Sequence, residues 1–154
     1  MRHHVLAIVA LAAVAPPAAA QPVDADVVAV RGTVEQFLDD LGHRRLDALP
    51  SQLAPKATLV VVRQRDGEWT TSHQTADEWL AGLRAQASPT TFREPLTNVT
   101  IHVESGRMAF LRADFTVVVD GDVRSHGIDY FTLVKDNAAW KIVNLGYTST
   151  PGPP

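Results

Sequence analysis

Residues 92–147 read FREPLTNVTIHVESGRMAFLRADFTVVVDGDVRSHGIDYFTLVKDNAAWKIVNLGY, and this stretch decides the fold. Runs rich in β-branched and aromatic residues alternate with short breaks of Gly, Asp, Asn and Ser, the residues that suit tight turns. The runs cover residues 97–103, 107–119, 124–134 and 138–147. Because only antiparallel strands can be joined by connections this short, the stretch predicts a four-strand antiparallel meander.

One face of the second run is uniformly apolar. Side chains alternate between the two faces of a strand. The face in question holds Ala109, Leu111, Ala113, Phe115, Val117 and Val119. This face is therefore expected to cover a core. In the third run the same alternation puts Asp129 beside Phe131 and Leu133, and neither face of that run is wholly polar. The pattern predicts a curved sheet that helices and a second subunit cover in part on both sides.

The segment before the meander has a helical period. Apolar residues recur there at spacings of three and four, namely Val27, Val30, Val34, Leu38 and Leu41. This spacing predicts an amphipathic helix. Asp24 or Asp26 can cap its start, and Gly42 suits its end. A shorter helical piece is predicted around residues 46–53, with Pro50 in its first turn or at a break, because proline inside a helix removes a hydrogen bond.

A hairpin and a third helix are predicted next. Residues 57–64 form a β-branched run, and Asp66-Gly67 is a turn from which residues 68–72 can return as a strand. Thr75 and Glu78 have the spacing of a capping box, which opens a helix. That helix points Trp79, Leu80 and Leu83 inward and ends at Ser88-Pro89. The expected product is one α+β domain over residues 21–150, followed by an extended tail over residues 151–154.

The first twenty residues have the pattern of an export signal. Arg2 provides a positive start, residues 5–14 form a short apolar run, and Ala18-Ala19-Ala20 offers small residues for cleavage. The apolar run is too short for a permanent membrane span. We therefore expect an exported protein, periplasmic or secreted, whose mature chain starts near Gln21. An uncleaved N-terminal anchor is the alternative.

Composition excludes several classes of function. The chain has no cysteine, so disulfides, thiolate metal sites and a cysteine nucleophile are excluded. Loss of Arg2 with the signal takes Lys and Arg from 14 to 13 against 17 Asp and Glu, a formal charge of −4. A mildly acidic chain without a basic block is a poor partner for nucleic acid or for an anionic membrane.

The order of these elements resembles the NTF2-like superfamily, and more narrowly its SnoaL-like or DUF4440-type bacterial branch. The likeness rests on EQFLDDLGHRRLDALPSQLAPKATLVVV and GIDYFTLVKDNAAWKIVNLGYTS, and it covers residues 27–147. It implies a cone: a curved antiparallel sheet wrapped around a long N-terminal helix, with two shorter helices and a pocket at the open end. Members of the superfamily include isomerases, dehydratases, cyclases and non-catalytic binding modules, so the fold alone does not select a function.

Catalytic positions carried over from the related ketosteroid isomerases match this chain at one place of three. The general-base Asp of that family corresponds to a position at or near Val61, which cannot accept a proton. Its oxyanion-hole Tyr corresponds to Phe37, which lacks the hydroxyl. Its second oxyanion donor, a protonated Asp, corresponds to Asp129. The resemblance therefore implies that steroid isomerisation by that mechanism does not take place here.

Asp129 is the best single polar candidate. A carboxyl among apolar neighbours has a raised pKa and can act as an acid or a hydrogen-bond donor at neutral pH; a carboxylate satisfied by backbone or an arginine is the alternative. His73, between the hairpin and the capped helix, is the candidate base, with an ordinary surface histidine as its alternative. His126 is an odd step from Asp129 and should point to the opposite face.

Aromatic residues are the remaining clue to a ligand. Five of them are expected to line the pocket: Phe37, Trp69, Trp79, Phe131 and Tyr147. Such side chains suit a small flat or ring-shaped molecule. The histidines lack the spacing of a ligand set, so neither a metal nor a cofactor is expected.

The preferred interpretation is an exported domain that binds a small hydrophobic molecule and forms a homodimer through the open sheet face. The alternative is a lyase or isomerase that uses Asp129 as an acid or hydrogen-bond donor and His73 as a base. The two interpretations differ in what lines the pocket, because an enzyme needs Asp129 and a second titratable group in one cavity.

Overall fold

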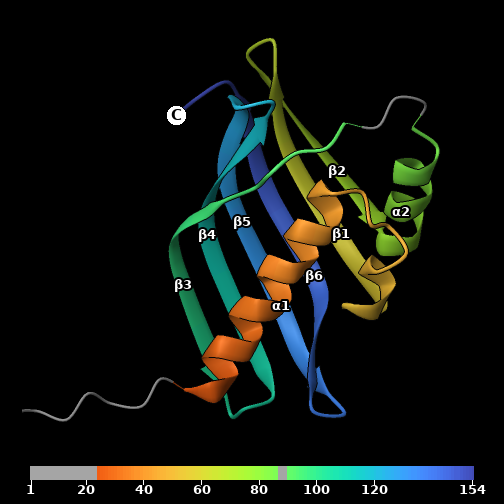
Figure 1. The fold of residues 1–154 in the computed structure, drawn as a ribbon, viewed down its shortest axis with the longest axis vertical. Helices are drawn as coiled ribbons and strands as arrows, with labels where there is room; N and C mark the ends of the chain where they lie inside the picture. The colour runs from red at the N-terminus through yellow and green to blue at the C-terminus, as the bar shows by residue number, and fades with distance from the viewer. Residues whose placement is uncertain (1–23, 87–89) are drawn as a thin grey trace, which may run out of the picture.

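The protein is described here from a computed structural model that covers residues 24–86 and 90–154. The predicted export signal and the predicted helix stop at Ser88-Pro89 lie outside the described residues. The elements in chain order are α1 (Ala25–Gly42), the 3₁₀ turn η1 (Leu49–Ser51), β1 (Leu53–Arg65), β2 (Glu68–Thr75), α2 (Ala76–Arg84), β3 (Leu96–Glu104), β4 (Met108–Val119), β5 (Asp122–Asp136) and β6 (Ala139–Pro151). The strands form one sheet in the order β2-β1-β6-β5-β4-β3 (Figure 1).

The predicted meander is confirmed. Strands β3, β4, β5 and β6 pair antiparallel with their neighbours in sequence. The three turns contain residues with positive φ, namely Ser105, Gly106, Asp120, Gly121, Asn137 and Ala138. Positive φ lets a short turn follow the twist of the flanking strands. The core face predicted for β4 is confirmed at residues 109, 111, 113 and 115, which are at most 4% exposed, whereas Val117 and Val119 are only half-buried.

The sheet contains one parallel pair, and in this respect it differs from the expected antiparallel sheet. Strand β1 pairs with β2 as the predicted hairpin, with Asp66 and Gly67 at positive φ, but it pairs in parallel with β6. The reason is topological. After β2 the chain crosses through α2 to the far edge of the sheet, and the meander then returns strand by strand until β6 reaches β1. Short turns indicate which strands are consecutive neighbours, but they do not indicate where the meander ends.

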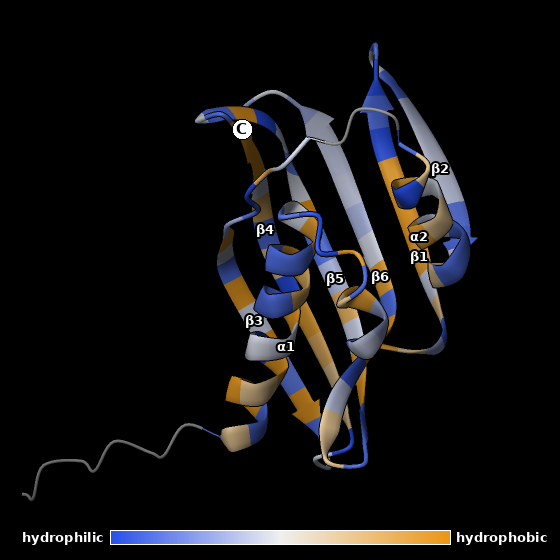
Figure 2. Ribbon diagram, turned by 45° about the vertical axis from the view of Figure 1, so that its right-hand side comes forward, coloured by the Kyte–Doolittle hydropathy of each residue, from blue (hydrophilic) through white to orange (hydrophobic). Residues whose placement is uncertain are grey.

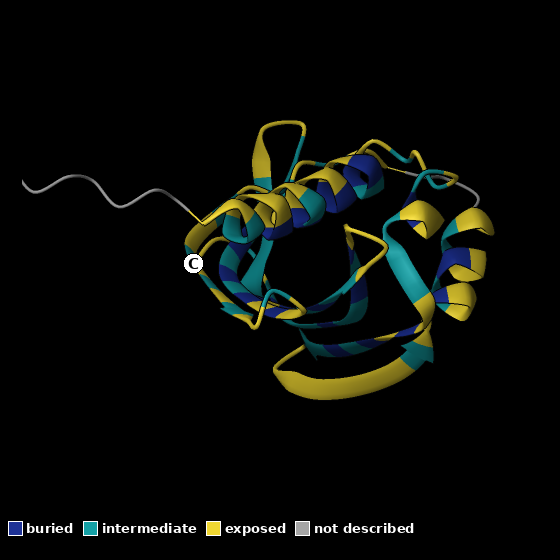
Figure 3. Cartoon of the chain, turned by 90° about the horizontal axis from the view of Figure 1, so that it is seen from below, coloured by how far each residue is buried: buried dark blue, intermediate teal, exposed yellow. Residues whose placement is uncertain are grey.

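Helix α1 lies across the concave face of the sheet (Figures 1 and 3). Asp24 is its N-cap and accepts a hydrogen bond from the Asp26 backbone N–H at 2.8 Å. Its buried face consists of Val30, Val34, Phe37 and Leu38, which pack on the apolar inner face of the strands (Figure 2). The predicted amphipathic helix is therefore confirmed, with Gly42 as its last residue and His43 as its C-cap.

The two shorter helices differ in length from the expectation. The piece predicted around residues 46–53 is only the 3₁₀ turn η1, in which Pro50 occupies the first turn. Leu53 already belongs to β1. Helix α2 begins at the predicted capping box, in which Thr75 and Glu78 each bond the other's backbone N–H. Within residues 24–86 and 90–154, neither α-helix has the length and hydrophobicity that a membrane crossing requires.

Gly127 allows β5 and β6 to approach closely. A Cβ atom at this position would lie 1.8 Å from the Thr148 carbonyl oxygen and 3.0 Å from the Phe115 ring. A rigid backbone oxygen cannot move aside cheaply, so the sheet would have to open. Gly32, in the middle of α1, has nothing within 4 Å of the same position.

Two alanine substitutions should therefore have opposite effects. Gly127→Ala should lower the free energy of unfolding by about 1–3 kcal/mol, because the strands must separate to admit the methyl group. Gly32→Ala should raise it by about 0.5–1 kcal/mol, because alanine is the better helix former. Urea denaturation of both variants measures the difference. Equal effects would mean that Gly127 does not limit the spacing of the strands.

Candidate functional site

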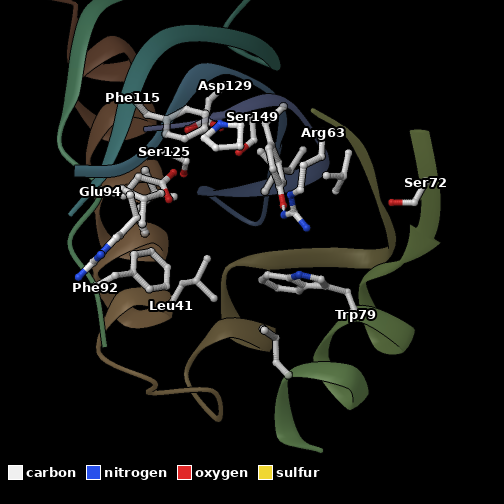
Figure 4. A pocket seen from close by; sticks show the side chains of 18 of the residues that line it. Leu41, Arg63, Ser72, Trp79, Phe92, Glu94, Phe115, Ser125, Asp129 and Ser149 are labelled. Carbon is white, nitrogen blue, oxygen red and sulfur yellow. Dashed lines mark hydrogen bonds between the residues drawn. The ribbon is translucent and has the colours of Figure 1, made fainter. Parts of the chain in front are cut away.

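A cavity of about 740 Å³ opens at one end of the cone. Its walls come from the C-terminal half of α1, from α2, and from the inner face of β1, β4, β5 and β6 (Figure 4). The apolar part of the wall includes Leu41, Val61, Trp79, Phe92, Phe115 and Leu145. The cavity is therefore open, and its wall contains polar groups as well as apolar side chains.

Glu94 enters the cavity from the segment that joins α2 to β3. This segment is held along β4 by paired backbone hydrogen bonds between Arg93 and Val118, at 2.8 and 2.9 Å. Its residues alternate as in a strand, so Arg93 and Pro95 are exposed while Phe92 and Glu94 turn inward and line the cavity. The extended conformation of residues 92–95 thus positions a carboxyl that belongs to no named strand.

Asp129 meets Glu94 inside the cavity. It lies on β5 between Ala113 of β4 and Tyr147 of β6, and it is 2% exposed. The carboxyls of Asp129 and Glu94 are within hydrogen-bonding reach of each other. The Oδ2 atom of Asp129 is buried and has no hydrogen-bond donor among the described residues. Because ionised carboxyls only accept hydrogen bonds, a proton on one of the two groups would supply the missing donor.

Burial explains why the pair keeps a proton. Desolvation raises the pKa of Asp129 to about 7. Desolvation and the neighbouring Asp129 also raise the pKa of Glu94 well above its usual range. A charge costs free energy when it leaves water, and two like charges in contact cost more. At neutral pH the pair therefore behaves as an acid that can donate as well as accept a proton.

Tyr147 pairs with Asp129 across β5 and β6, and it contacts Arg63. Its hydroxyl accepts a hydrogen bond from Arg63 Nη2 at 2.9 Å, and its ring meets Phe115 edge-on with the centroids 6.2 Å apart. Burial raises the pKa of Tyr147, and the nearby Glu94 and Asp129 raise it further, whereas Arg63 lowers it. The cavity thus holds a row of polar groups set in an apolar wall.

Three of the predicted site residues line the cavity together: Asp129, Trp79 and Tyr147. Phe37 and Phe131 do not reach it, because they are 0% and 1% exposed and pack in the core. The Phe37 ring stacks on Trp79 at 5.9 Å and meets Phe131 edge-on at 6.2 Å. The prediction that these two phenylalanines contact a ligand is therefore wrong. They support the cavity wall from behind.

Trp69 and His73 lie outside the cavity. Trp69 is 52% exposed at the start of β2, next to the hairpin turn. His73 is exposed between Ser72 and Gln74, two residues that do line the cavity. Strand alternation turns His73 to the opposite face. The expected pairing of His73 with Asp129 therefore does not form. His126 also faces away, as predicted, and its Nδ1 contacts the Gly152 carbonyl at 2.9 Å.

Two residues of the site, Glu94 and Arg63, were missed by sequence reasoning. Arg63 lies two residues after Val61 in β1, so the alternation of that strand could have placed it on the inner face. Glu94 precedes the first predicted strand, and only the bridge to Val118 places it opposite Asp129. Among the described residues, no cluster of three or more His, Asp and Glu side chains is suited to a metal ion.

The carboxyl pair predicts an unusual dependence of stability on pH. Since Asp129 has a pKa of 3.8 in an exposed setting and about 7 in the fold, the folded chain binds more protons between these values. The free energy of unfolding should then fall as pH rises through this window, by up to about 1.4 kcal/mol per pH unit for each extra proton.

Urea denaturation at several pH values from 5 to 8 measures this slope. Asp129→Asn, which cannot ionise at this position, should fold. Its free energy of unfolding should decrease less between pH 5 and 8 than that of the wild-type protein. Other carboxyls do not obscure the result, because the lowered pKa values of Asp26, Asp40 and Asp114 put their contribution at lower pH. A wild-type curve that stays level from pH 5 to 8 would contradict the assignment.

Comparison with known proteins agrees with this architecture. A crystal structure of a protein of unknown function with a cystatin-like fold from Nostoc punctiforme is similar with a TM-score of 0.67 and 15% identity, over 82% of this chain and 92% of that one. An NTF2-like protein from Shewanella oneidensis gives a TM-score of 0.61 and 14% identity, over 79% and 98%. A putative scytalone dehydratase from Novosphingobium aromaticivorans gives 0.60 and 14%, over 81% and 84%.

These likenesses show the fold alone, because each identity is low. A search of curated protein sequences found no match. A model of the family described as "putative lumazine-binding", however, matches residues 25–148, which is most of the chain. The chain therefore belongs to this putative lumazine-binding family, within the NTF2-like superfamily that its element order resembles.

Proposed function

We propose that the protein binds a small, largely apolar, ring-shaped molecule in the cavity at the open end of the cone. One observation carries this proposal: a cavity of about 740 Å³ is walled by Trp79, Phe92 and Phe115 and has buried polar groups at its inner end. Cavities of this size that combine aromatic walls with a few convergent polar groups are typical of small-molecule sites.

The family description supports a ring-shaped ligand. It names lumazine, a fused two-ring heterocycle, and the aromatic side chains of Trp79, Phe92 and Phe115 in the cavity wall suit contact with such a ring. The carboxyl pair of Glu94 and Asp129 can both donate and accept a hydrogen bond, so it can orient a hydroxyl, carbonyl or ring nitrogen of the ligand.

Two tryptophan variants test the location of the site. 2-Naphthol serves as a ring-shaped probe, and isothermal titration calorimetry measures its affinity. Trp79→Ala removes an aromatic wall and should weaken binding roughly tenfold. Trp69→Ala removes an exposed tryptophan outside the cavity and should leave the affinity unchanged.

Thermal unfolding provides the control, because Trp79 also stacks on Phe37. The comparison is made at a temperature where both variants are folded. Equal losses in the two variants would place the probe elsewhere, and a wild-type protein that does not bind 2-naphthol would contradict the proposed function.

A second candidate function is a lyase or isomerase activity, and the Glu94–Asp129 pair favours it. General acid and base catalysis requires titratable groups near the working pH at a common point in a cavity. Glu94 is the candidate acid, because desolvation and the neighbouring Asp129 raise its pKa well above the usual range, and Asp129, with a pKa of about 7, is the candidate base. The expected roles of Asp129 as acid and His73 as base therefore change. The structural similarity to a putative scytalone dehydratase is consistent with such chemistry but, at 14% identity, does not establish it.

Proton abstraction next to a carbonyl tests this second function. 2-Tetralone, a two-ring ketone, exchanges its α-hydrogens with D2O, and proton NMR follows the loss of signal. The wild-type protein should accelerate exchange relative to buffer. Asp129→Asn or Glu94→Gln should lower the protein-catalysed exchange rate about a hundredfold. Trp69→Ala should exchange at the wild-type rate. If wild-type protein and buffer give the same rate, the acid–base function is contradicted for this ketone and only binding remains.

Export and dimer formation stay predictions. The export signal lies outside the described residues. The outer sheet face does expose aromatic side chains, with Phe110 at 47% and Tyr130 at 52%, as a subunit contact would require.

A further inference from the structure

Arg63 is a partly buried cation without an anionic partner. It lies on the inner face of β1 and lines the cavity. Within the described residues it forms no ion pair, and its one side-chain hydrogen bond goes to the Tyr147 hydroxyl at 2.9 Å. Figure 4 shows it apart from Glu94, on the other side of Asp129. A guanidinium with unused donors in an apolar cavity is expected to be matched by an acceptor that arrives with the ligand.

Tyr147 adds a second donor at the same place. Its oxygen accepts the hydrogen bond from Arg63, so its own O–H remains free to donate. Among the described residues the hydroxyl has no acceptor for that proton. The bond from a cation also polarises the phenol and strengthens it as a donor. Arg63 and Tyr147 therefore present N–H and O–H donors side by side.

We propose that Arg63 and Tyr147 form a site for a carboxylate, so that the ligand of the cavity is a ring-containing organic acid bound as its anion. The inference rests on the proposed function and names the class of ligand. The ring lies against Trp79 and Phe92, and the carboxylate accepts hydrogen bonds from Arg63 and Tyr147. A charged acceptor strengthens the bond from the neutral Tyr147 hydroxyl, and a carboxylate can also accept two parallel hydrogen bonds from the Arg63 guanidinium.

The charges around the cavity agree with an anionic guest. Arg65 and Arg124 also line it, although Arg124 is partly offset by Asp122 at 3.3 Å. Of the residues that the structure describes, Glu94 and Asp129 are the carboxyls that line it. Their raised pKa values keep them from carrying two negative charges at neutral pH. A cavity with more positive than negative charge attracts an anion and repels a cation of the same shape.

A matched pair of probes tests the inference. 2-Naphthoate and 2-naphthamide have the same rings and nearly the same shape, but only the first is charged. Isothermal titration calorimetry at pH 6 compares them, since the carboxyl pair keeps its proton there. The wild-type protein should bind 2-naphthoate at least about tenfold more tightly than 2-naphthamide.

Variants then assign the preference to this site. Arg63→Gln should abolish the preference, Arg63→Lys should keep part of it, and Tyr147→Phe should reduce it a few-fold because one donor is lost. Arg107→Gln removes the same charge from an exposed position outside the cavity and should keep the wild-type ratio. Circular dichroism establishes that each variant is folded. Tyr147→Phe and Arg63→Lys still test the site if Arg63→Gln does not fold.

The outcomes separate the two proposals. If both probes bind with equal affinity, the carboxylate site is wrong and the proposed binding function stands. If neither probe binds, both are overturned. A preference that survives in Arg63→Gln, or that Arg107→Gln abolishes to the same degree, would also overturn the assignment to Arg63.

Discussion

One helix has to cover a sheet that is longer than the helix. Helix α1 has 18 residues and is about 27 Å long, whereas β5 has 15 residues and spans about 50 Å. The apolar face of α1 can therefore cover only part of the concave sheet. The core lies where the helix covers the strands, and the cavity lies at the C-terminal end of the helix, where Leu38 and Leu41 line it together with α2, Phe92 and Glu94. The position of the site follows from this mismatch in length.

The polar groups of the cavity depend on the same arrangement. A carboxyl on the inner face of a fully covered strand would have to be neutral or paired, because an isolated buried charge is too costly. Asp129 lies near the point where the cover ends, so it is buried but still reaches the cavity. Its partner Glu94 comes from the segment that closes the wall. The pKa values of the two groups are thus raised because residues 92–95 and α2 cover the end of the cone and keep water from the carboxyls.

Arg63 and Tyr147 make the cavity wall asymmetric, because their donors do not lie at the same place as the Glu94 carboxyl. Arg63, which bonds the Tyr147 hydroxyl, lies on the other side of Asp129 from Glu94, and the aromatic rings of Trp79, Phe92 and Phe115 line the same cavity (Figure 4). A guest with a ring and an oxygen-bearing group can be oriented by such an arrangement, because polar contacts fix its position while the apolar wall supplies most of the contact area. Binding and proton transfer would both use this geometry.

Much of the fold could be predicted because its signals are local. Turn residues, the alternation along β4, the apolar stripe of α1 and the Thr75–Glu78 capping box each act within a few residues. The predicted helix around residues 46–53 failed because Pro50 and the start of β1 leave room for a single turn. The parallel pairing of β1 with β6 could not be predicted, since it joins strands that no short turn connects.

The site shows the same division. Alternation placed Asp129 on the same face as Phe131 and Leu133. It would also have excluded His73 from the cavity had the register of β2 been known. Five aromatic residues looked equivalent in the sequence, but burial separates Phe37 and Phe131 in the core from Trp79 and Tyr147 in the wall, and leaves Trp69 outside. The amino-acid sequence by itself determined the two α-helices and most of the strands, the inward face of β4 and the family. Only the tertiary structure brought Glu94 to Asp129 and Arg63 to Tyr147, because these contacts join segments 35 and 84 residues apart and depend on where the covering helix ends.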